Sequence, residues 1–209
     1  MARYLESSCK VCRRLGNKLI LKGDKCIGEH CPINKKPYIP GQHGPVKRRT
    51  KITDYGIHLL EKQKAKFYYC LMEKQFKRYF EEASRQRKIP TGERLIQLLE
   101  LRLDNVIYRS GIGISRNISR QFVLHRKVFV NGKYVNIASF QVKPGDVIKL
   151  KEDFRDNIFV KAALEKKVNI PSWFSFDSNK FEIEIIKLPP REEINVPFDD
   201  QLIVEFYSK

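Results

Sequence analysis

The chain has 209 residues, with 41 Lys and Arg against 24 Asp and Glu, so its formal net charge is +17. Its hydrophobic content of 42%, with 13 Phe and 9 Tyr, excludes a chain that is disordered throughout. No apolar run approaches the roughly 18 residues of a membrane span, and the first residues lack the apolar stretch of a signal peptide. We therefore expect a soluble intracellular protein whose basic charge indicates a polyanionic partner.

The first 53 residues carry 13 Lys and Arg against 3 Asp and Glu, and include a cysteine-rich segment. Two pairs with the spacings C-x2-C and C-x4-C are separated by thirteen residues: Cys9, Cys12, Cys26 and Cys31. Such pairs let two turns complete a tetrahedral sulfur shell, so we expect one structural zinc ion that compensates for a poor apolar core. Free thiols, two disulfides, or His30 in place of one thiolate are the alternatives, and disulfides are disfavoured in a cytosolic chain.

A turn-rich stretch at residues 38–45 precedes a run of cations made up of Lys47, Arg48, Arg49 and Lys51. Such a run is either a solvated surface or a phosphate contact. The neighbouring glycines allow close backbone approach, so we expect contact with phosphate.

Residues 54–91 have the pattern of a helical segment. Asp54 can cap one long helix over about 55–87, because apolar residues from Ala65 to Ala83 recur at spacings of three and four. Cys70 falls in this apolar stretch and is expected to be buried. Pro90, Thr91 and Gly92 then suggest a domain boundary.

Residues 92–155 predict two helices followed by a small antiparallel sheet. The first helix runs from about residue 95 to 105, and Ser115 caps a second of about ten residues. Arg116 and Arg120, four residues apart, share one face of that helix, and Lys127 lies close to the same line. We expect both arginines to be exposed and to reach phosphates together, so that the fold would tolerate their replacement. The Asn131-Gly132 pair between apolar residues predicts a hairpin, and a further strand is expected over 147–150.

The last segment, residues 156–209, is acidic overall. We expect a helix over 158–167, a strand over 181–186 and a final strand over 202–206. We also expect this segment to pack back on the first domain and to present its carboxylates to solvent or to a basic protein. The whole chain therefore predicts an α+β protein with an N-terminal zinc knuckle, a helical part and an RNA-binding module at 92–155.

Taken together, several short motifs resemble one family, the bacterial-type small-subunit ribosomal protein S-four. The similarity extends over essentially the whole chain. The motifs are Pro40–Gly44 (PGQHG), Glu73–Phe76 (EKQF), Leu103–Arg109 (LDNVIYR), Ser119–Gln121 (SRQ), Val130–Gly132 (VNG) and Val142–Asp146 (VKPGD). The four-cysteine segment resembles the zinc-binding branch of that family. The chain departs from the common pattern at Arg126-Lys127, where Gly-His is usual, at Cys70, where Gly is common, and at Leu60, where Arg is common.

The resemblance implies a structural constituent of the small ribosomal subunit in the cytoplasm, although an organellar origin remains open. Members bind the 5′ domain of small-subunit ribosomal RNA and nucleate assembly. They lie beside ribosomal proteins S-three and S-five where messenger RNA enters the subunit, affect translational accuracy and in some bacteria repress their own messenger RNA. No membrane partner is implied.

A multi-helix RNA junction is a dense phosphate surface that is recognised through shape and backbone, so scattered basic patches suit it. The expected RNA-binding residues are Lys47, Arg48, Arg49, Lys51, Arg102, Arg109, Arg116, Arg120 and Lys127. No phosphate-binding loop or catalytic motif is present, which argues against an enzyme. Two rivals remain open: an RNA-modifying enzyme such as a pseudouridine synthase that carries the module as an appendage, and a zinc-dependent DNA-binding regulator.

Overall fold

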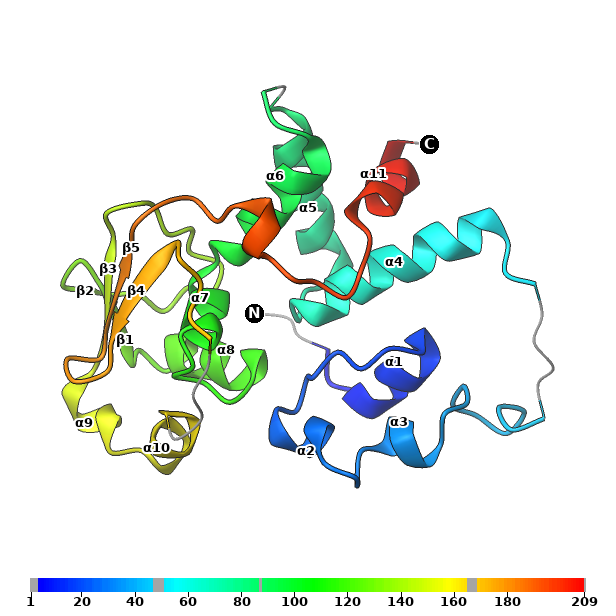
Figure 1. Cartoon of the computed structure of the whole chain (residues 1–209), viewed down its shortest axis with the longest axis horizontal. Coiled ribbons are helices and arrows are strands. Elements are labelled where there is room, and N and C mark those ends of the chain that lie inside the picture. The colour runs from blue at the N-terminus through cyan, green and yellow to red at the C-terminus, as the bar shows by residue number, and fades with distance from the viewer. Residues whose placement is uncertain (1–3, 47–50, 87, 165–168, 209) are drawn as a thin grey trace. The chain divides into compact units, whose positions relative to one another are not determined.

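The computed structural model describes residues 4–46, 51–86, 88–164 and 169–208 (Figure 1). It divides into two compact units: unit 1 comprises Met1–Leu95 with Val196–Lys209, and unit 2 comprises Ile96–Asn195. The predicted α+β class is confirmed by many helices and one antiparallel sheet. Within the described ranges, no helix combines the length and apolar character that crossing a membrane requires.

Unit 1 is helical. Its elements are α1 (Ser8–Leu15), α2 (Asp24–Ile27), α3 (Pro32–Lys35), α4 (Asp54–Tyr68), α5 (Glu73–Ser84), the start of α6 (Thr91–Glu100) and α11 (Asp200–Ser208). Val11 and Leu19 of the N-terminal segment pack against Phe67 and Tyr68 at the end of α4, which anchors the short helices on the longer one. Thr53, not Asp54, caps α4, because its hydroxyl accepts a hydrogen bond from the Gly56 amide.

The prediction of one helix over 55–87 is wrong, because the chain breaks between α4 and α5. The Leu71 amide donates to the Lys66 carbonyl and the Cys70 amide to the Phe67 carbonyl, which is the hydrogen-bond pattern of a Schellman motif. Cys70 occupies the left-handed position of that motif with φ 55°. Glycine is the usual residue at this position. Because the chain has cysteine there instead, no glycine or proline in the sequence marks the break.

The predicted final strand over 202–206 is also wrong, since these residues belong to α11, which lies beside α4 in Figure 1. Ile203 is fully buried, and the ring of Tyr207, four residues on, stacks on Phe80 with centroids 4.6 Å apart. Glu205 bonds to His58 of α4 at 2.6 Å. The run of apolar residues therefore follows a helical period and fills the space between α4 and α5.

A shared carboxylate ties α4, α5 and α11 together within unit 1. Glu73 accepts hydrogen bonds from Lys62 at 2.7 Å, Lys66 at 3.2 Å and the Tyr207 hydroxyl at 2.9 Å. Burial of Glu73 acts to raise its pKa, but these three donors prevail and lower it. Burial and the bond to Glu73 raise the pKa of Tyr207, so this hydroxyl stays a donor.

Unit 2 contains the rest of α6 and a five-stranded sheet. Its other elements are α7 (Leu103–Arg109), α8 (Arg116–Leu124), β1 (Val128–Val130), β2 (Lys133–Tyr134), β3 (Val147–Leu150), α9 (Glu152–Arg155), α10 (Ile158–Leu164), β4 (Phe174–Asp177), β5 (Glu182–Ile185) and the 3-10 turn η1 (Arg191–Glu193). The strand order is β2-β1-β3-β5-β4, and every pairing is antiparallel. The single helix predicted over about 95–105 is wrong, because this stretch contains the end of α6 and the start of α7, with Leu101 and Arg102 between them.

The predicted hairpin is confirmed. Asn131 and Gly132 join β1 to β2 with φ angles of 50° and 75°, the positive pair that a tight hairpin turn requires. The Asn131 side chain donates to Asp146 at 2.8 Å, and Asp146 also accepts from the Lys143 amide at 2.8 Å. Asp146 is therefore a turn-stabilising carboxylate, as its place after Pro144-Gly145 predicts.

Much of the acidic last segment belongs to unit 2 rather than unit 1. Strand β5 pairs with β3, with Ile148 opposite Ile183, and the unpredicted strand β4 pairs with β5. Trp173 is 1% exposed in the same core as these strands. The predicted boundaries at 91–92 and 155–156 therefore do not coincide with the division of the structure, and only Val196–Lys209 joins unit 1.

Replacing Ile183 with Ala tests whether β5 is part of the unit 2 core. Ile183 is fully buried in that core, so the substitution is expected to lower the free energy of unfolding by about 2–5 kcal/mol. The measurement is urea denaturation of the purified protein. The neighbouring exposed residue gives the control, since Glu184→Ala should change stability by less than about 0.5 kcal/mol. Equal effects of the two changes would contradict this placement.

Candidate RNA-binding surface and cysteine cluster

A buried ion-pair network holds two of the predicted RNA-binding arginines. Arg102, the residue before α7, is 0% exposed and grips Asp104 with two bonds, Nε to Oδ1 at 3.1 Å and Nη2 to Oδ2 at 2.7 Å. Arg120 of α8 reaches the same Asp104 Oδ2 from the other side at 3.4 Å. One carboxylate thus bridges two guanidinium groups and fixes α8 against the start of α7.

A second branch of the network holds the other two arginines. Glu100, whose side chain is 1% exposed, receives both Nε and Nη2 of Arg109 at 2.9 and 2.8 Å. Asn105 donates to Glu100 at 2.8 Å and accepts from Arg116 Nε at 2.9 Å. The Arg116 guanidinium also lies over the Tyr108 ring, 4.3 Å from its centroid.

The expectation that Arg116 and Arg120 project into solvent is therefore wrong. Each is only 5% exposed, and each is held by a polar group of α7 or its first turn. Their spacing of four residues does place them on one helical face, but that face points into unit 2. The two branches thus hold four guanidinium groups inside unit 2 through Asp104, Glu100 and Asn105.

Lys127 lies in a different place, in a hollow of about 470 Å³ at the end of α8. The lining residues are His125, Arg126, Lys127, Tyr134, Asn136 and Lys151. The Lys127 carbonyl accepts the Lys151 amide at 2.9 Å, which sets the two lysine backbones side by side. The sequence predicted Lys127 as an RNA-binding residue and showed the added charge of Arg126. The contributions of Tyr134 in β2 and of Lys151 after β3 follow only from the fold.

The structure describes only one residue, Lys51, of the predicted basic run that follows the turn-rich stretch. Lys51 is exposed just before α4. Lys47, Arg48 and Arg49 lie outside the described residues. Their role in RNA binding stays a prediction.

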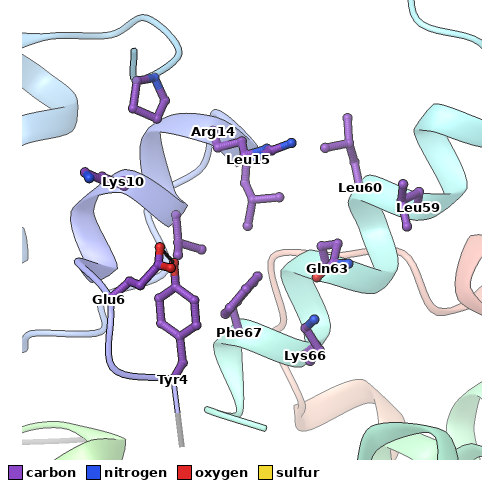
Figure 2. A pocket seen from close by; sticks show the side chains of 12 residues that line it. Tyr4, Glu6, Lys10, Arg14, Leu15, Leu59, Leu60, Gln63, Lys66 and Phe67 are labelled. Atoms are coloured by element: carbon purple, nitrogen blue, oxygen red, sulfur yellow. Dashed lines mark hydrogen bonds between the residues drawn. The ribbon is translucent and has the colours of Figure 1, made fainter. Parts of the chain in front are cut away.

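A second hollow, of about 490 Å³, opens between α1 and α4 within unit 1 (Figure 2). Leu15 of α1 and Leu60 and Phe67 of α4 line it, and the Tyr4 ring packs edge-on against Phe67 with centroids 5.1 Å apart. Three cations, Lys10, Arg14 and Lys66, also line it, against a single carboxylate, Glu6. A hollow lined by apolar and basic side chains can bind an apolar group that carries negative charge.

The four paired cysteines lie on the short helices of unit 1. Cys9 and Cys12 are one turn apart on α1, Cys26 is in α2, and Cys31 precedes α3. Burial raises the pKa of the Cys12 thiol against the lowering effect of a backbone hydrogen bond, and the charges of Cys26, Cys9 and Cys31 raise it further. Cys12, Cys26 and Cys31 are buried, whereas Cys70, which was predicted to be buried, is only partly buried against the same core cluster as Cys12.

The donor set fits structural zinc in its chemistry, because four thiols in two short-spaced pairs are what a closed tetrahedral site uses. The Lys22 amide donates to Cys26 Sγ at 3.3 Å, an orientation that stabilises a thiolate. Among the residues that the structure describes, no three His, Cys, Asp or Glu side chains form a group that could hold a metal ion. The zinc site stays a prediction.

Replacing Arg102 with Ala should destabilise the protein strongly, because it leaves the buried Asp104 carboxylate without its two-bond partner. The expected loss of unfolding free energy is about 3–5 kcal/mol, measured by urea denaturation. Lys133→Ala, at an exposed position of the same unit, is the control and should stay within about 0.5 kcal/mol. If both variants unfold at the same urea concentration, the network does not support the fold.

Comparison with known families accounts for most of the chain. Residues 3–100 match the family described as "Ribosomal protein S4/S9 N-terminal domain", and residues 101–148 match the "S4 domain". Proteins named "Small ribosomal subunit protein uS4" are 52% identical in Dictyoglomus thermophilum, 50% in Thermoanaerobacter sp. (strain X514) and 46% in Magnetococcus marinus, with 100% of both chains covered in each case. The predicted resemblance is confirmed, and the chain belongs to the uS4 family of small-subunit ribosomal proteins.

Proposed function

We propose that the protein is a structural constituent of the small ribosomal subunit in the cytoplasmic ribosome and binds ribosomal RNA directly. The observation that carries this proposal is the hollow around Lys127, where cationic and polar side chains converge and no carboxylate forms the lining. A phosphate backbone is the ligand that such a lining favours, since affinity for RNA comes largely from Lys and Arg contacts.

The RNA segment that we propose is the 5′ domain of small-subunit ribosomal RNA, where binding would nucleate assembly. Rigid basic surfaces such as the Lys127 hollow suit a folded junction, which presents phosphates in a fixed arrangement. The basic hollow of unit 1 supports a second contact area on the same RNA. A position beside S-three and S-five near the path of messenger RNA, with an effect on accuracy, and repression of its own messenger RNA remain parts of this proposal.

Two observations weigh against the rival functions. Within the described residues, the chain after the matched module packs with it in unit 2 as far as Asn195, and strands β4 and β5 extend the sheet of that module, so this segment does not form a third unit of its own. The sequence after the cysteines does not supply a free recognition helix, because α4 buries its inner face against α11. An RNA-modifying enzyme and a DNA-binding regulator are therefore less suited to this fold.

The acidic groups of the last segment suit contact with a basic neighbour such as S-five. Glu193 is engaged by Ser172, whose amide donates at 2.8 Å, and Glu192 is exposed in the same turn. In unit 1, Asp200 is the first residue of α11, and the preceding Asp199 accepts a hydrogen bond from the Gln201 amide at 2.8 Å. Phosphate would be repelled at these positions, whereas Lys and Arg of another protein would be attracted.

We also propose one structural zinc ion on Cys9, Cys12, Cys26 and Cys31. The supporting features are the two short spacings, the burial of three of the thiols and the small size of the N-terminal core. The metal would fix the short helices α1, α2 and α3, which are too brief to be stable alone.

RNA binding is tested with purified protein and a transcript of the 5′ domain. Lys127→Ala should weaken binding by about 1 kcal/mol and flatten the slope of log affinity against log salt by about one unit, since one phosphate contact is lost. Lys161→Ala, an exposed residue of α10 paired with Asp156, is the control and should bind as the unaltered protein does. Equal affinity for the transcript, an unrelated RNA and duplex DNA would contradict the proposed specificity.

Zinc is tested by metal analysis of protein purified under reducing conditions. About one equivalent is expected in the unaltered protein and in Cys70→Ser, whereas Cys12→Ser should retain much less and unfold more readily. Protein that holds no metal yet keeps an equally ordered N-terminal segment would contradict the prediction.

A further inference from the structure

We infer that the hollow at the end of α8 is a binding site for a phosphate of the RNA backbone, and that Arg126 is retained there for its charge at a backbone position that favours glycine. This inference deepens the proposed function and rests on it. It concerns one residue that lies on the rim of the hollow and was not among the predicted RNA-binding residues.

The first observation is the backbone conformation of Arg126, whose φ is 55°. The Lys127 amide donates to the Phe122 carbonyl at 3.1 Å, and the Arg126 amide donates to the Val123 carbonyl at 3.0 Å. These bonds define a Schellman motif in which Arg126 holds the left-handed position. Any side chain with a Cβ is strained there, whereas glycine is not.

The second observation is that no side-chain contact within the described residues explains why an arginine occupies position 126. Its side chain is exposed, and within the described residues it forms no ion pair or ring contact, although its neighbours do. Lys151 pairs with Asp153 at 2.6 Å, and the Lys127 ammonium lies 5.5 Å from the centroid of the Phe154 ring. The strain at Arg126 is thus not offset by a contact within unit 2.

The third observation is the chemistry of the hollow. Arg126, Lys127 and Lys151 enter it from the end of α8 and from the residue after β3, and Asn136 and the exposed Tyr134 add a polar amide and a ring. The residues that line the hollow include no carboxylate, and Lys151 pairs with Asp153 outside that lining at 2.6 Å. A guanidinium can give two parallel bonds to one phosphate, which the lysines cannot do.

The alternative is that Arg126 only complements the negative end of the α8 dipole. The two explanations make opposite predictions for stability. A residue that serves the helix end stabilises the fold, so its removal lowers the melting temperature. A residue retained for a ligand is tolerated by the fold, so glycine in its place raises the melting temperature.

The experiment compares three variants of the full chain in thermal unfolding and in binding to the 5′ domain transcript. Arg126→Gly should raise the melting temperature by roughly 2–4 °C while lowering affinity about threefold to tenfold and flattening the salt slope by about one unit. Arg126→Gln, which keeps the strain and loses the charge, should bind as weakly without the gain in stability. Arg126→Lys should retain most of the affinity.

Cys70 supplies a matched control, because it occupies the same position of a Schellman motif at the end of α4. Cys70→Gly relieves the same backbone conformation without removing a cation and should leave affinity and salt slope unchanged. The inference is overturned if Arg126→Gly binds the transcript as tightly as the unaltered protein, or if it unfolds at a lower temperature. Failure of the unaltered protein to bind the transcript would instead remove the proposed function, and this inference with it.

Discussion

The bridging of two arginines by the buried carboxylate of Asp104 is the constraint on which unit 2 depends. Arg102 precedes α7 and Arg120 lies on α8, so their common partner sets the angle at which these helices meet. Removing one partner of such a group leaves an uncompensated charge in a region without water. The same two helices also contribute Ile107 and Val123 to the buried apolar core of the unit.

The same constraint changes how the basic charge of the module is used. Charges that a sequence count assigns to the surface are in part structural here, because Glu100 and Asp104 engage three guanidinium groups and the Asn105 amide oxygen engages a fourth. The total charge of the sequence therefore overstates how many cations unit 2 presents at its surface. Arg126, Lys127 and Lys151 come together where α8 ends and β3 leaves the sheet.

The sequence predicted correctly those parts of the fold that depend on interactions between residues close together in the chain. The Asn131-Gly132 turn and the Ser115 cap were read correctly, since each depends on the conformation and hydrogen bonds of a few neighbouring residues. The break at Cys70 was missed because no glycine marks it, and the helix at the end of the chain was taken for a strand because a short apolar run fits either period. The burial of Arg116 could not be predicted, since it depends on Asn105, eleven residues earlier, in a helix that was itself not foreseen.

The path of the chain through the two units has a consequence for synthesis. Helix α11 contains the last described residues, yet it packs on α4 through Glu205 and on α5 through Tyr207. Unit 2 lies wholly between the two parts of unit 1 in the sequence. During translation, unit 2 can therefore complete its core while the first 95 residues still lack the helix that closes theirs. The part of the protein that is made first therefore completes its core only after α11 has been made.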